Sequence, residues 1–277
     1  MTVGSALASV ADRLQAAGCE SPRVDAEILV GHVLGLARSE LPLERERDVA
    51  DDRLATLEEL VARRERREPL AYVLGEWGFR RLTLNVDARV LVPRPETEVV
   101  VERCLARLAT LAEPRALDVG TGSGAIALAI ADECPGARAT GIDASADALE
   151  VARSNSLRTG VPVELREWDV FAGLPDGPWD LVVSNPPYVL PEEIGALALE
   201  VREWEPREAL VGAGVTEAIA RGALAVLRRP AGALVFEVAD GDAPRVAELL
   251  RELGYVGVST TRDLAGRERV VEAACPS

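Results

Sequence analysis

The sequence has 277 residues, of which 48% are hydrophobic and only 4% aromatic. This length is typical of one catalytic-sized domain together with a smaller one. A core that must be built mostly from alanine, valine and leucine favours helices packed on a parallel sheet. The net charge is −15, and every one of the 31 basic residues is an arginine. Such a surface repels a phosphate backbone, so we expect no direct nucleic-acid partner.

The cysteines and the single histidine argue against a metal site. Cys19, Cys104, Cys134 and Cys275 are far apart and form no C-x-x-C pair, and His32 has no histidine partner. Neither a zinc site nor a disulfide framework is expected. The segment "MTVGSALASVADRLQ" has no basic leader, and no apolar run approaches the roughly 20 residues of a membrane span. We therefore expect a cytoplasmic protein that binds no metal and no membrane.

Apolar residues recur at helical spacing from Ser5 to about Arg67. This periodicity predicts a small helical bundle, with breaks at Gly18–Pro22 and at Leu41–Asp48. The charged run "RRERRE", Arg63–Glu68, is expected to be a solvated helix end. We assign residues 1–75 to an N-terminal helical domain.

The pattern changes between Pro69 and Pro95 to short alternating segments, "WGFRRLTLNV" and "RVLVP". Such alternation predicts a β-hairpin, which we place at residues 76–94 as an ordered linker. The stretch "PRPETEVVVERCLARL" then predicts a helix that starts near Pro95, with glutamates where the helix dipole favours them. The catalytic domain is expected to span residues 95–277.

Strand and helix patterns alternate after Pro114, which predicts a doubly wound, mostly parallel sheet of seven strands. The last two strands are close in sequence, which suggests a reversed final strand. The predicted strands are Arg115–Val119, Ala137–Asp143, Val163–Glu167, Asp180–Ser184, Ala233–Val238, Tyr255–Thr260 and Arg269–Ala274. The predicted helices are Ala125–Glu133, Ala146–Thr159, Glu217–Leu227 and Ala243–Leu253.

A glycine-rich turn follows the first of these strands in "ALDVGTGSGAIALAIA". Gly120, Gly122 and Gly124 permit a tight turn and let backbone N–H groups approach a ligand. Thr121 and Ser123 lie between them. The spacing is G-x-G-x-G, whereas the dinucleotide fingerprint is G-x-G-x-x-G. A purely structural turn and a nicotinamide or flavin site remain alternatives on this motif alone.

Three consecutive strands are each followed closely by a carboxylate. Asp118 lies at the end of the first, Asp143 ends the second, and Asp169 follows the third. Asp143 could accept hydrogen bonds from both hydroxyls of a ribose, and Asp169 could accept from an exocyclic adenine amine. Val170 or Phe171 could cover the adenine ring. Helix capping explains any one of these residues but explains the set of three less well.

The stretch "DLVVSNPPYVL" begins as a buried strand and then stops abruptly at Asn185-Pro186-Pro187-Tyr188. Neither proline can donate to a sheet ladder. The stop falls at the strand end where α/β proteins usually bind ligands. A Pro-Pro strand stop without catalytic meaning is the alternative interpretation.

Several motifs together resemble known methyltransferases. "LDVGTGSGAIALAIA", "GIDASADALEVARSN" and "NPPY" are similar to class I S-adenosylmethionine-dependent methyltransferases. "PRPETE", "SNPPYV" and "EVREWEPREAL" resemble the protein N5-glutamine methyltransferases that act on class 1 peptide-chain release factors, and this resemblance covers nearly the whole chain. It implies a Rossmann-like methyltransferase domain that binds S-adenosylmethionine through Asp118, Gly120, Thr121, Gly122, Ser123, Gly124, Asp143, Asp169, Val170 and Asn185.

The resemblance also implies a substrate and roles for the N-P-P-Y residues. The Asn185 side-chain oxygen and the Pro186 carbonyl would accept the two N–H groups of a glutamine amide. Pro187 would help to hold that carbonyl outside the sheet, and Tyr188 would form a flat wall for the amide. The N-terminal helical domain would dock the protein substrate.

Other functions remain open. The same tetrapeptide suits a ribosomal-protein glutamine or the exocyclic amine of adenine in nucleic acid, and an inactive module that only binds S-adenosylmethionine is a non-enzymatic alternative. The chain departs from the family pattern after Leu210, in "LVGAGVTEAIARG", and at Ala239–Asp242, in "EVADGDA". Both departures bear on the choice of substrate.

Overall fold

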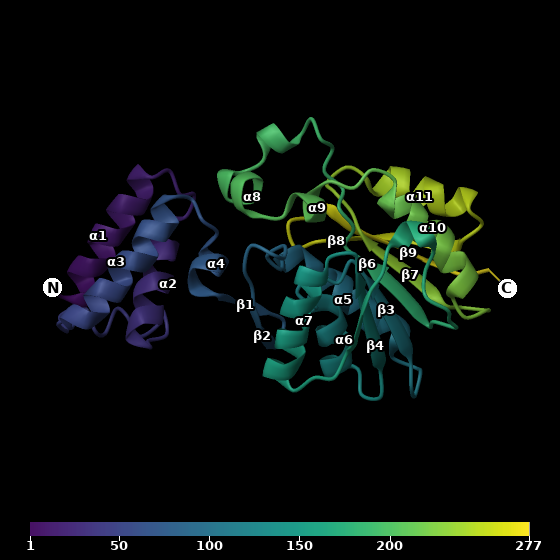
Figure 1. Cartoon of the computed structure of the whole chain (residues 1–277), viewed down its shortest axis with the longest axis horizontal. Coiled ribbons are helices and arrows are strands. Elements are labelled where there is room, and N and C mark those ends of the chain that lie inside the picture. The colour runs from purple at the N-terminus through teal and green to yellow at the C-terminus, as the bar shows by residue number, and fades with distance from the viewer. Residues whose placement is uncertain (277) are drawn as a thin grey trace. The chain divides into compact units, whose positions relative to one another are not determined.

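The computed structural model describes residues 1–276 and divides into two compact units (Figure 1). Unit 1 comprises Met1–Glu76 and Ala198–Trp204, and unit 2 comprises Trp77–Leu197 and the chain from Glu205 onward. The chain therefore leaves unit 2, contributes one short segment to unit 1, and returns. Within residues 1–276, no helix is both long and apolar enough to cross a membrane, and no cluster of potential metal ligands occurs.

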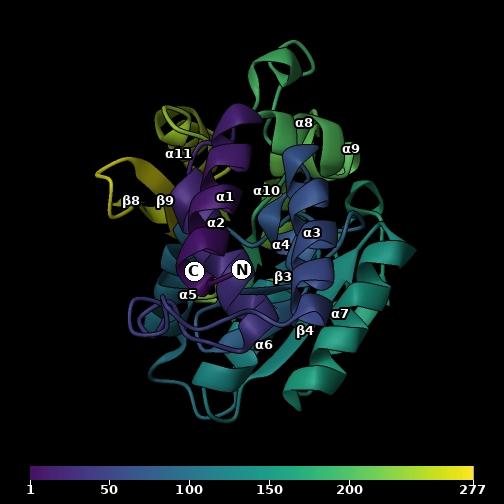
Figure 2. The same cartoon turned by 90° about the vertical axis from the view of Figure 1, so that its left-hand side faces the viewer.

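Unit 1 is the predicted helical bundle. Its helices are α1 (Val3–Ala16), α2 (Pro22–Leu34), α3 (Asp51–Glu65), α4 (Leu70–Leu74) and α8 (Leu199–Trp204). The first three helices are labelled in Figure 2. Their apolar faces meet in a core that includes Val10, Leu14, Leu29 and Val61. Helix formation follows the 3.6-residue periodicity of these residues, and Gly35 ends α2 in the left-handed conformation that glycine tolerates.

Helix α8 is held in unit 1 by ion pairs. The Arg64 guanidinium lies 2.8 Å from Asp25 and 2.9 Å from Glu200, and Arg67 lies 2.7 Å from Glu200. Arg64 is only 6% exposed. The prediction that Arg63–Glu68 forms a solvated helix end is therefore wrong for Arg64, because two carboxylates from distant segments compensate its buried charge.

The predicted hairpin is confirmed at β1 (Glu76–Phe79) and β2 (Leu82–Asn85). Its expected continuation in "RVLVP" is wrong, because the segment Arg89–Pro93 contains no strand. This segment instead lines the cavity described below. An alternating pattern forms a strand only when a neighbouring strand takes up its backbone hydrogen bonds, and none pairs with this segment among the described residues.

Unit 2 contains a seven-stranded sheet in the order β5-β4-β3-β6-β7-β9-β8. The first five strands of this order are parallel, and β9 runs antiparallel to both of its neighbours. The predicted reversed final strand is thus confirmed. The strands are β3 (Arg115–Val119), β4 (Arg138–Asp143), β5 (Glu164–Glu167), β6 (Leu181–Ser184), β7 (Ala233–Glu237), β8 (Val256–Arg262) and β9 (Glu268–Ala274).

Successive residues of β6 pack on opposite faces of the sheet. Leu181 and Val183 join the core beneath α5 and α6, whereas Val182 joins the core beneath α10 and α11. A sheet covered on both faces explains why β6 reads as a continuous apolar run. The helices of unit 2 are α5 (Pro95–Leu108), α6 (Ala125–Glu133), α7 (Ala146–Thr159), α9 (Arg207–Leu210), α10 (Val215–Val226) and α11 (Ala243–Glu252), with single turns at Val170–Ala172 and Ile194–Ala196.

The strand order reverses between β3 and β6. From β3 the chain proceeds to β4 and β5 on one side, and β6 then returns to pair with the other edge of β3. Ligands of open α/β sheets bind outside the carboxyl ends of the strands at such a reversal. The glycine turn follows β3 and Asn185 follows β6, so the topology brings both motifs to this place.

Candidate active site

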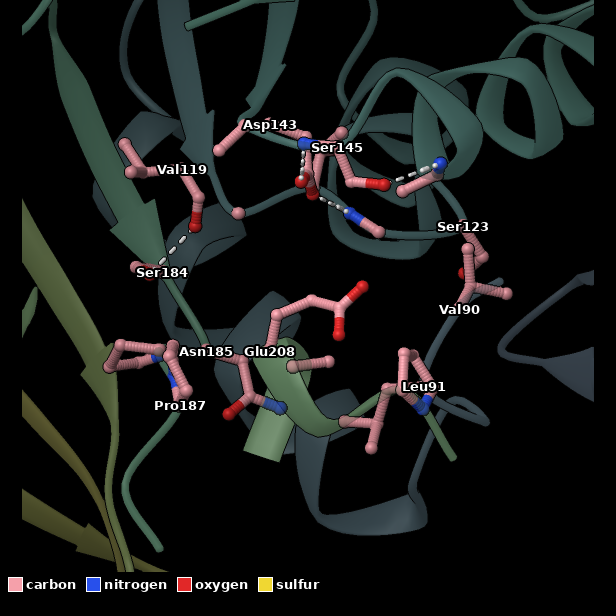
Figure 3. A pocket seen from close by; sticks show the side chains of 18 of the residues that line it. Val90, Leu91, Val119, Ser123, Asp143, Ser145, Ser184, Asn185, Pro187 and Glu208 are labelled. Atoms are coloured by element: carbon pink, nitrogen blue, oxygen red, sulfur yellow. Dashed lines mark hydrogen bonds between the residues drawn. The ribbon is translucent and has the colours of Figure 1, made fainter. Parts of the chain in front are cut away.

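A cavity of about 540 Å³ opens at the carboxyl ends of β3, β4 and β6, entirely within unit 2 (Figure 3). Its volume lies within the usual range for small-molecule sites. Its lining includes Arg89–Arg94, Thr97, Val119–Ser123, Asp143–Ser145, Trp168–Phe171, Ser184–Pro187, Glu208, Val215 and Ile219. These residues include no histidine, cysteine or lysine. The titratable acids that they offer are the carboxyl groups of Asp143, Asp169 and Glu208.

The glycine turn forms one wall of the cavity. Gly120 and Gly122 have φ angles of 70° and 54°, and no heavy atom lies within 4 Å of the position where either would carry a Cβ. The Gly120 and Thr121 N–H groups donate to the Ile142 carbonyl at 2.8 and 3.0 Å, which ties the turn to β4. The glycines thus leave the backbone of the turn open to close approach by a ligand.

Asp118 and Gly124, which are predicted to contact the cofactor, both lie outside the lining of the cavity. Asp118 is 2% exposed and lies outside the cavity lining, where its Oδ2 accepts from the Thr121 hydroxyl at 2.6 Å and from the Ala127 N–H at 3.1 Å. Burial raises the pKa of Asp118 to about 7. Gly124 packs against Leu128 and Ala152. Both residues therefore support the conformation of the glycine turn through contacts on the side away from the cavity.

Asp143 lies at the end of β4 and faces the cavity (Figure 3). Its Oδ2 accepts from the Gly122 N–H and its Oδ1 from the Ser145 N–H, both at 2.9 Å. Burial raises the pKa of the Asp143 carboxyl above its usual range, and these backbone donors oppose that shift. Each carboxylate oxygen keeps a further lone pair, so the group can accept two hydrogen bonds from a ligand.

The segment after β5 forms an apolar side of the cavity. Trp168, Val170 and Phe171 line it together with Asp169. The Asp169 side chain accepts from the Phe171 N–H at 2.9 Å and so caps the single turn at Val170–Ala172. This cap uses one acceptor site of the Asp169 carboxylate. Asp169 also lines the cavity, so its other acceptor sites can serve a ligand.

The N-P-P segment lies across the cavity from Asp143 (Figure 3). It is fixed by the strand before it, because the buried Ser184 hydroxyl donates to the Val119 carbonyl at 2.7 Å. The Asn185 Nδ2 lies 3.5 Å from the Thr97 hydroxyl. Asn185, Pro186 and Pro187 all line the cavity. The structure thus brings the predicted amide-binding residues into the same cavity as the glycine turn.

Tyr188 is predicted to form a wall for the substrate amide. It lies outside the cavity lining, and 36% of the residue is exposed. Burial of its phenol, with the nearby Glu237 carboxyl, raises the pKa of Tyr188 to about 12.

The chain after Leu210, where the sequence departs from the family pattern, lies against the N-P-P segment. A Cβ on Gly212 would lie 2.3 Å from the Cγ of Pro187, so only glycine fits there without a shift. The Val189 N–H donates to the Leu210 carbonyl at 2.9 Å. Val215 and Ile219 line the cavity itself. The departure therefore bears directly on the shape of the site.

The lining also contains residues that were not predicted from the sequence, among them Thr97, Glu208 and the segment Arg89–Pro93. Glu208 lines the cavity and extends into it in Figure 3. Thr97 and Glu208 belong to "PRPETE" and "EPREAL", which were recognised as motifs without a role. For Thr97 the available signal was a polar residue on the buried face of α5, in line with Val100, Val101, Cys104 and Leu108.

Comparisons with known proteins agree with this geometry. Residues 5–75 match the family described as the PrmC N-terminal domain, and residues 97–203 match the methyltransferase small domain. The release factor glutamine methyltransferase of Caulobacter vibrioides is 38% identical over 98% of this chain and 96% of its own length. That of Deinococcus radiodurans is 40% identical over 99% of this chain and 98% of its own length.

A solved methyltransferase structure from Pyrococcus furiosus covers 82% of this chain and 100% of its own length, with a TM-score of 0.52 and 17% identity. That likeness shows the fold alone. The full-length similarity to the bacterial relatives goes further, because it includes both the helical domain and the methyltransferase domain. This chain belongs to the release factor glutamine methyltransferase family.

Proposed function

We propose that this protein transfers a methyl group from S-adenosylmethionine to the side-chain amide nitrogen of a glutamine in the Gly-Gly-Gln motif of class 1 peptide-chain release factors. The observation that carries the proposal is a single cavity that contains both the glycine turn with Asp143 and the amide-binding Asn185-Pro186 pair. Translation termination takes place in the cytoplasm, where we expect this protein to act.

The residues present fit S-adenosylmethionine. At Gly120 and Gly122 the cofactor has room to approach the backbone of the turn. The Asp143 carboxylate can accept hydrogen bonds from two ribose hydroxyls. Val170 and Phe171 offer apolar surface for a base, with Asp169 beside them. When bound, the cofactor supplies a methyl group made electrophilic by its sulfonium. Glu208, which extends into the same cavity, adds negative charge near a cationic ligand.

Asn185 and Pro186 orient the substrate. A glutamine amide is a poor nucleophile because its nitrogen lone pair is delocalised into the carbonyl. Two fixed acceptors, the Asn185 Oδ1 and the Pro186 carbonyl, can hold both N–H groups and so direct the lone pair toward the methyl carbon. The prolines fix the backbone that presents the carbonyl. Because the nitrogen becomes far more acidic on methylation, it can release its proton afterwards without a general base.

The charge of Glu208 gives a test of this cofactor assignment. We expect Glu208→Gln to weaken binding of S-adenosylmethionine roughly fivefold, the size of one charge–charge interaction in a solvated site. Binding of the product S-adenosylhomocysteine, whose sulfur carries no charge, should change much less. Calorimetry with both ligands measures this, with the exposed Glu192→Gln as the charge-matched control. Equal weakening of both ligands would show that Glu208 does not respond to the sulfonium charge.

We propose further that unit 1 docks the protein substrate. It is an independently packed helical unit, and it carries a hollow of about 370 Å³ lined by Arg66, Arg67, Leu199, Glu203 and Trp204. A protein substrate can contact this unit, whereas a short peptide that fills only the active-site cavity has no need of it.

Deleting residues 1–68 should therefore lower methylation of an intact release factor at least about tenfold, as for the loss of a docking interface. Methylation of a short Gly-Gly-Gln peptide and affinity for the cofactor should change little. The truncated chain should also carry Glu200→Gln, because the deletion removes Arg64 and Arg67, which pair with Glu200. If methylation of the intact release factor and of the short peptide fell equally, unit 1 would have no docking role.

Alternative substrates and an inactive binding module are separated by one pair of experiments. Calorimetry tests cofactor binding, and transfer of radiolabelled methyl groups is measured on a release factor, on ribosomal proteins and on nucleic acid. Labelling of the release factor alone supports the proposal. Binding of S-adenosylmethionine without transfer to any of them would favour the inactive module. The net charge of −15 favours protein over nucleic acid.

A further inference from the structure

A buried chain of hydrogen bonds ends at Asn185. The Thr97 hydroxyl donates to Oε2 of Glu237 at 2.7 Å, and the Asn185 Nδ2 lies 3.5 Å from the same hydroxyl oxygen. Thr97 is 4% exposed and Glu237 3% exposed. Buried polar groups that connect three separate elements fix one geometry when each has its partner.

The sheet register brings these residues together. Ser184 of β6 is paired with Phe236 of the parallel strand β7, so the next residues, Asn185 and Glu237, emerge side by side at the carboxyl end of the sheet. Thr97 lies in the first turn of α5, which packs on both strands. The three side chains thus meet because of topology and not because of closeness in sequence.

The direction of these bonds sets the orientation of the Asn185 carboxamide. A hydroxyl has one proton, and an ionised carboxylate can only accept, so Thr97 must give its proton to Glu237. The lone pairs of Thr97 then face Asn185 and require a donor there. Nδ2 satisfies this requirement and Oδ1 does not, which leaves Oδ1 at the opposite end of the group. Within residues 1–276, Oδ1 makes no recorded hydrogen bond.

We propose that Thr97 and Glu237 are positioning residues that keep the Asn185 carboxamide in one orientation, with Oδ1 available to accept from the substrate amide. The proposal rests on the proposed role of Asn185 in binding that amide. Neither residue needs to touch the reacting atoms. If the carboxamide turned over, a donor would face the substrate N–H, and the acceptor that orients the amide would be lost.

Glu237 makes the orientation sensitive to pH. Burial raises the pKa of Glu237 to about 7; Thr97, by donating to it, opposes that rise. The charged and titratable groups that face Glu237 are Glu96 and Arg94 at the start of α5, Arg269 on β9, and Tyr188. Once protonated, Glu237 can donate to Thr97, whose own proton is then free to point at Asn185 and to favour the wrong end of the carboxamide.

The wild-type kcat should therefore rise as the pH increases through about 7. The sign follows from the raised pKa, because the carboxylate that Thr97 needs as acceptor is present only above it. In Glu237→Gln this rise should disappear, since the amide does not titrate. Its Oε1 can still accept from Thr97, so activity should be lowered but retained.

The decisive experiment compares Thr97→Val, Thr97→Ser and a matched control. Thr97→Val is nearly isosteric and removes the hydroxyl, and we expect it to lower kcat roughly 10- to 100-fold, as for one orphaned buried hydrogen-bonding group. Cofactor affinity should stay unchanged. Thr97→Ser should restore most of the activity. The control Thr140→Val removes another buried threonine hydroxyl, one 3.4 Å from Glu164 and outside the cavity, and should keep wild-type kcat.

A double-mutant cycle separates failure of this proposal from failure of the proposed function. If Thr97 acts through Asn185, Thr97→Val should have almost no further effect in an Asn185→Ala background. Additive losses would contradict the proposal, and so would Thr97→Ser as inactive as Thr97→Val. Wild-type activity of Asn185→Ala itself would instead remove the proposed role of Asn185. If Thr97→Val does not fold, the pH profiles of the wild type and Glu237→Gln decide, and identical profiles overturn the proposal.

Discussion

Replacing Asn185 by alanine is expected to lower kcat by roughly 10²–10³, by analogy with the removal of one preorganised hydrogen-bonding group from an active site. The substrate amide would lose the acceptor that holds one of its N–H groups. The variant should remain folded, because the two prolines end the strand and Ser184 anchors it to Val119. The measurement is turnover at saturating cofactor and substrate, with thermal unfolding as the check on stability.

Two further variants sharpen this test. Asn85→Ala is the control, because the Asn85 side chain contacts Ser154 and Arg158 outside the cavity. Asn185→Asp should also impair turnover, since a carboxylate has no donor for the lone pair of Thr97. Its negative charge beside the sulfonium should keep or tighten cofactor binding, which stabilises the ground state and not the transition state. Wild-type turnover of Asn185→Ala would return N-P-P-Y to a structural strand stop.

Asp143→Ala should weaken S-adenosylmethionine binding by on the order of 1.5–3 kcal/mol, as for hydrogen bonds to a charged group. The substitution leaves the ribose hydroxyls without their acceptor and also frees the Gly122 N–H that the carboxylate holds in the turn. Calorimetry measures the dissociation constant directly. Asp147→Ala on the exposed side of α7 makes the same change of charge and should bind cofactor normally. A folded Asp143→Ala with unchanged affinity would refute the assignment.

The elements of the sheet could be predicted because each follows from local pattern. Apolar runs bounded by turn residues gave β3, β6 and β7, and the glycine turn follows β3 in the sequence itself. The order of strands then places the ends of β3 and β6 together. Periodicity states where a strand ends but not which way the next side chain points. For this reason Asp118 and Tyr188 were assigned to the cavity although the structure places them outside its lining.

Contacts between distant segments could not be predicted from local pattern. Arg64 and Glu200 are 136 residues apart, and Thr97 and Glu237 are 140 residues apart. A six-residue helix such as α8 has too few contacts of its own to reveal which unit it joins. The prediction of a strand at Arg89–Pro93 was wrong for a related reason. Its alternating apolar and polar residues resemble a strand, but a strand forms only where a neighbouring strand pairs with it.

Mass spectrometry of a release factor tests the central claim most directly. A class 1 release factor is incubated with this protein and S-adenosylmethionine, digested, and the peptide that contains Gly-Gly-Gln is sequenced by fragmentation. We predict a gain of one methyl group on the glutamine side chain, absent without cofactor and strongly reduced with Asn185→Ala. An unmodified glutamine in the presence of bound cofactor, or a methyl group on another residue, would contradict the account.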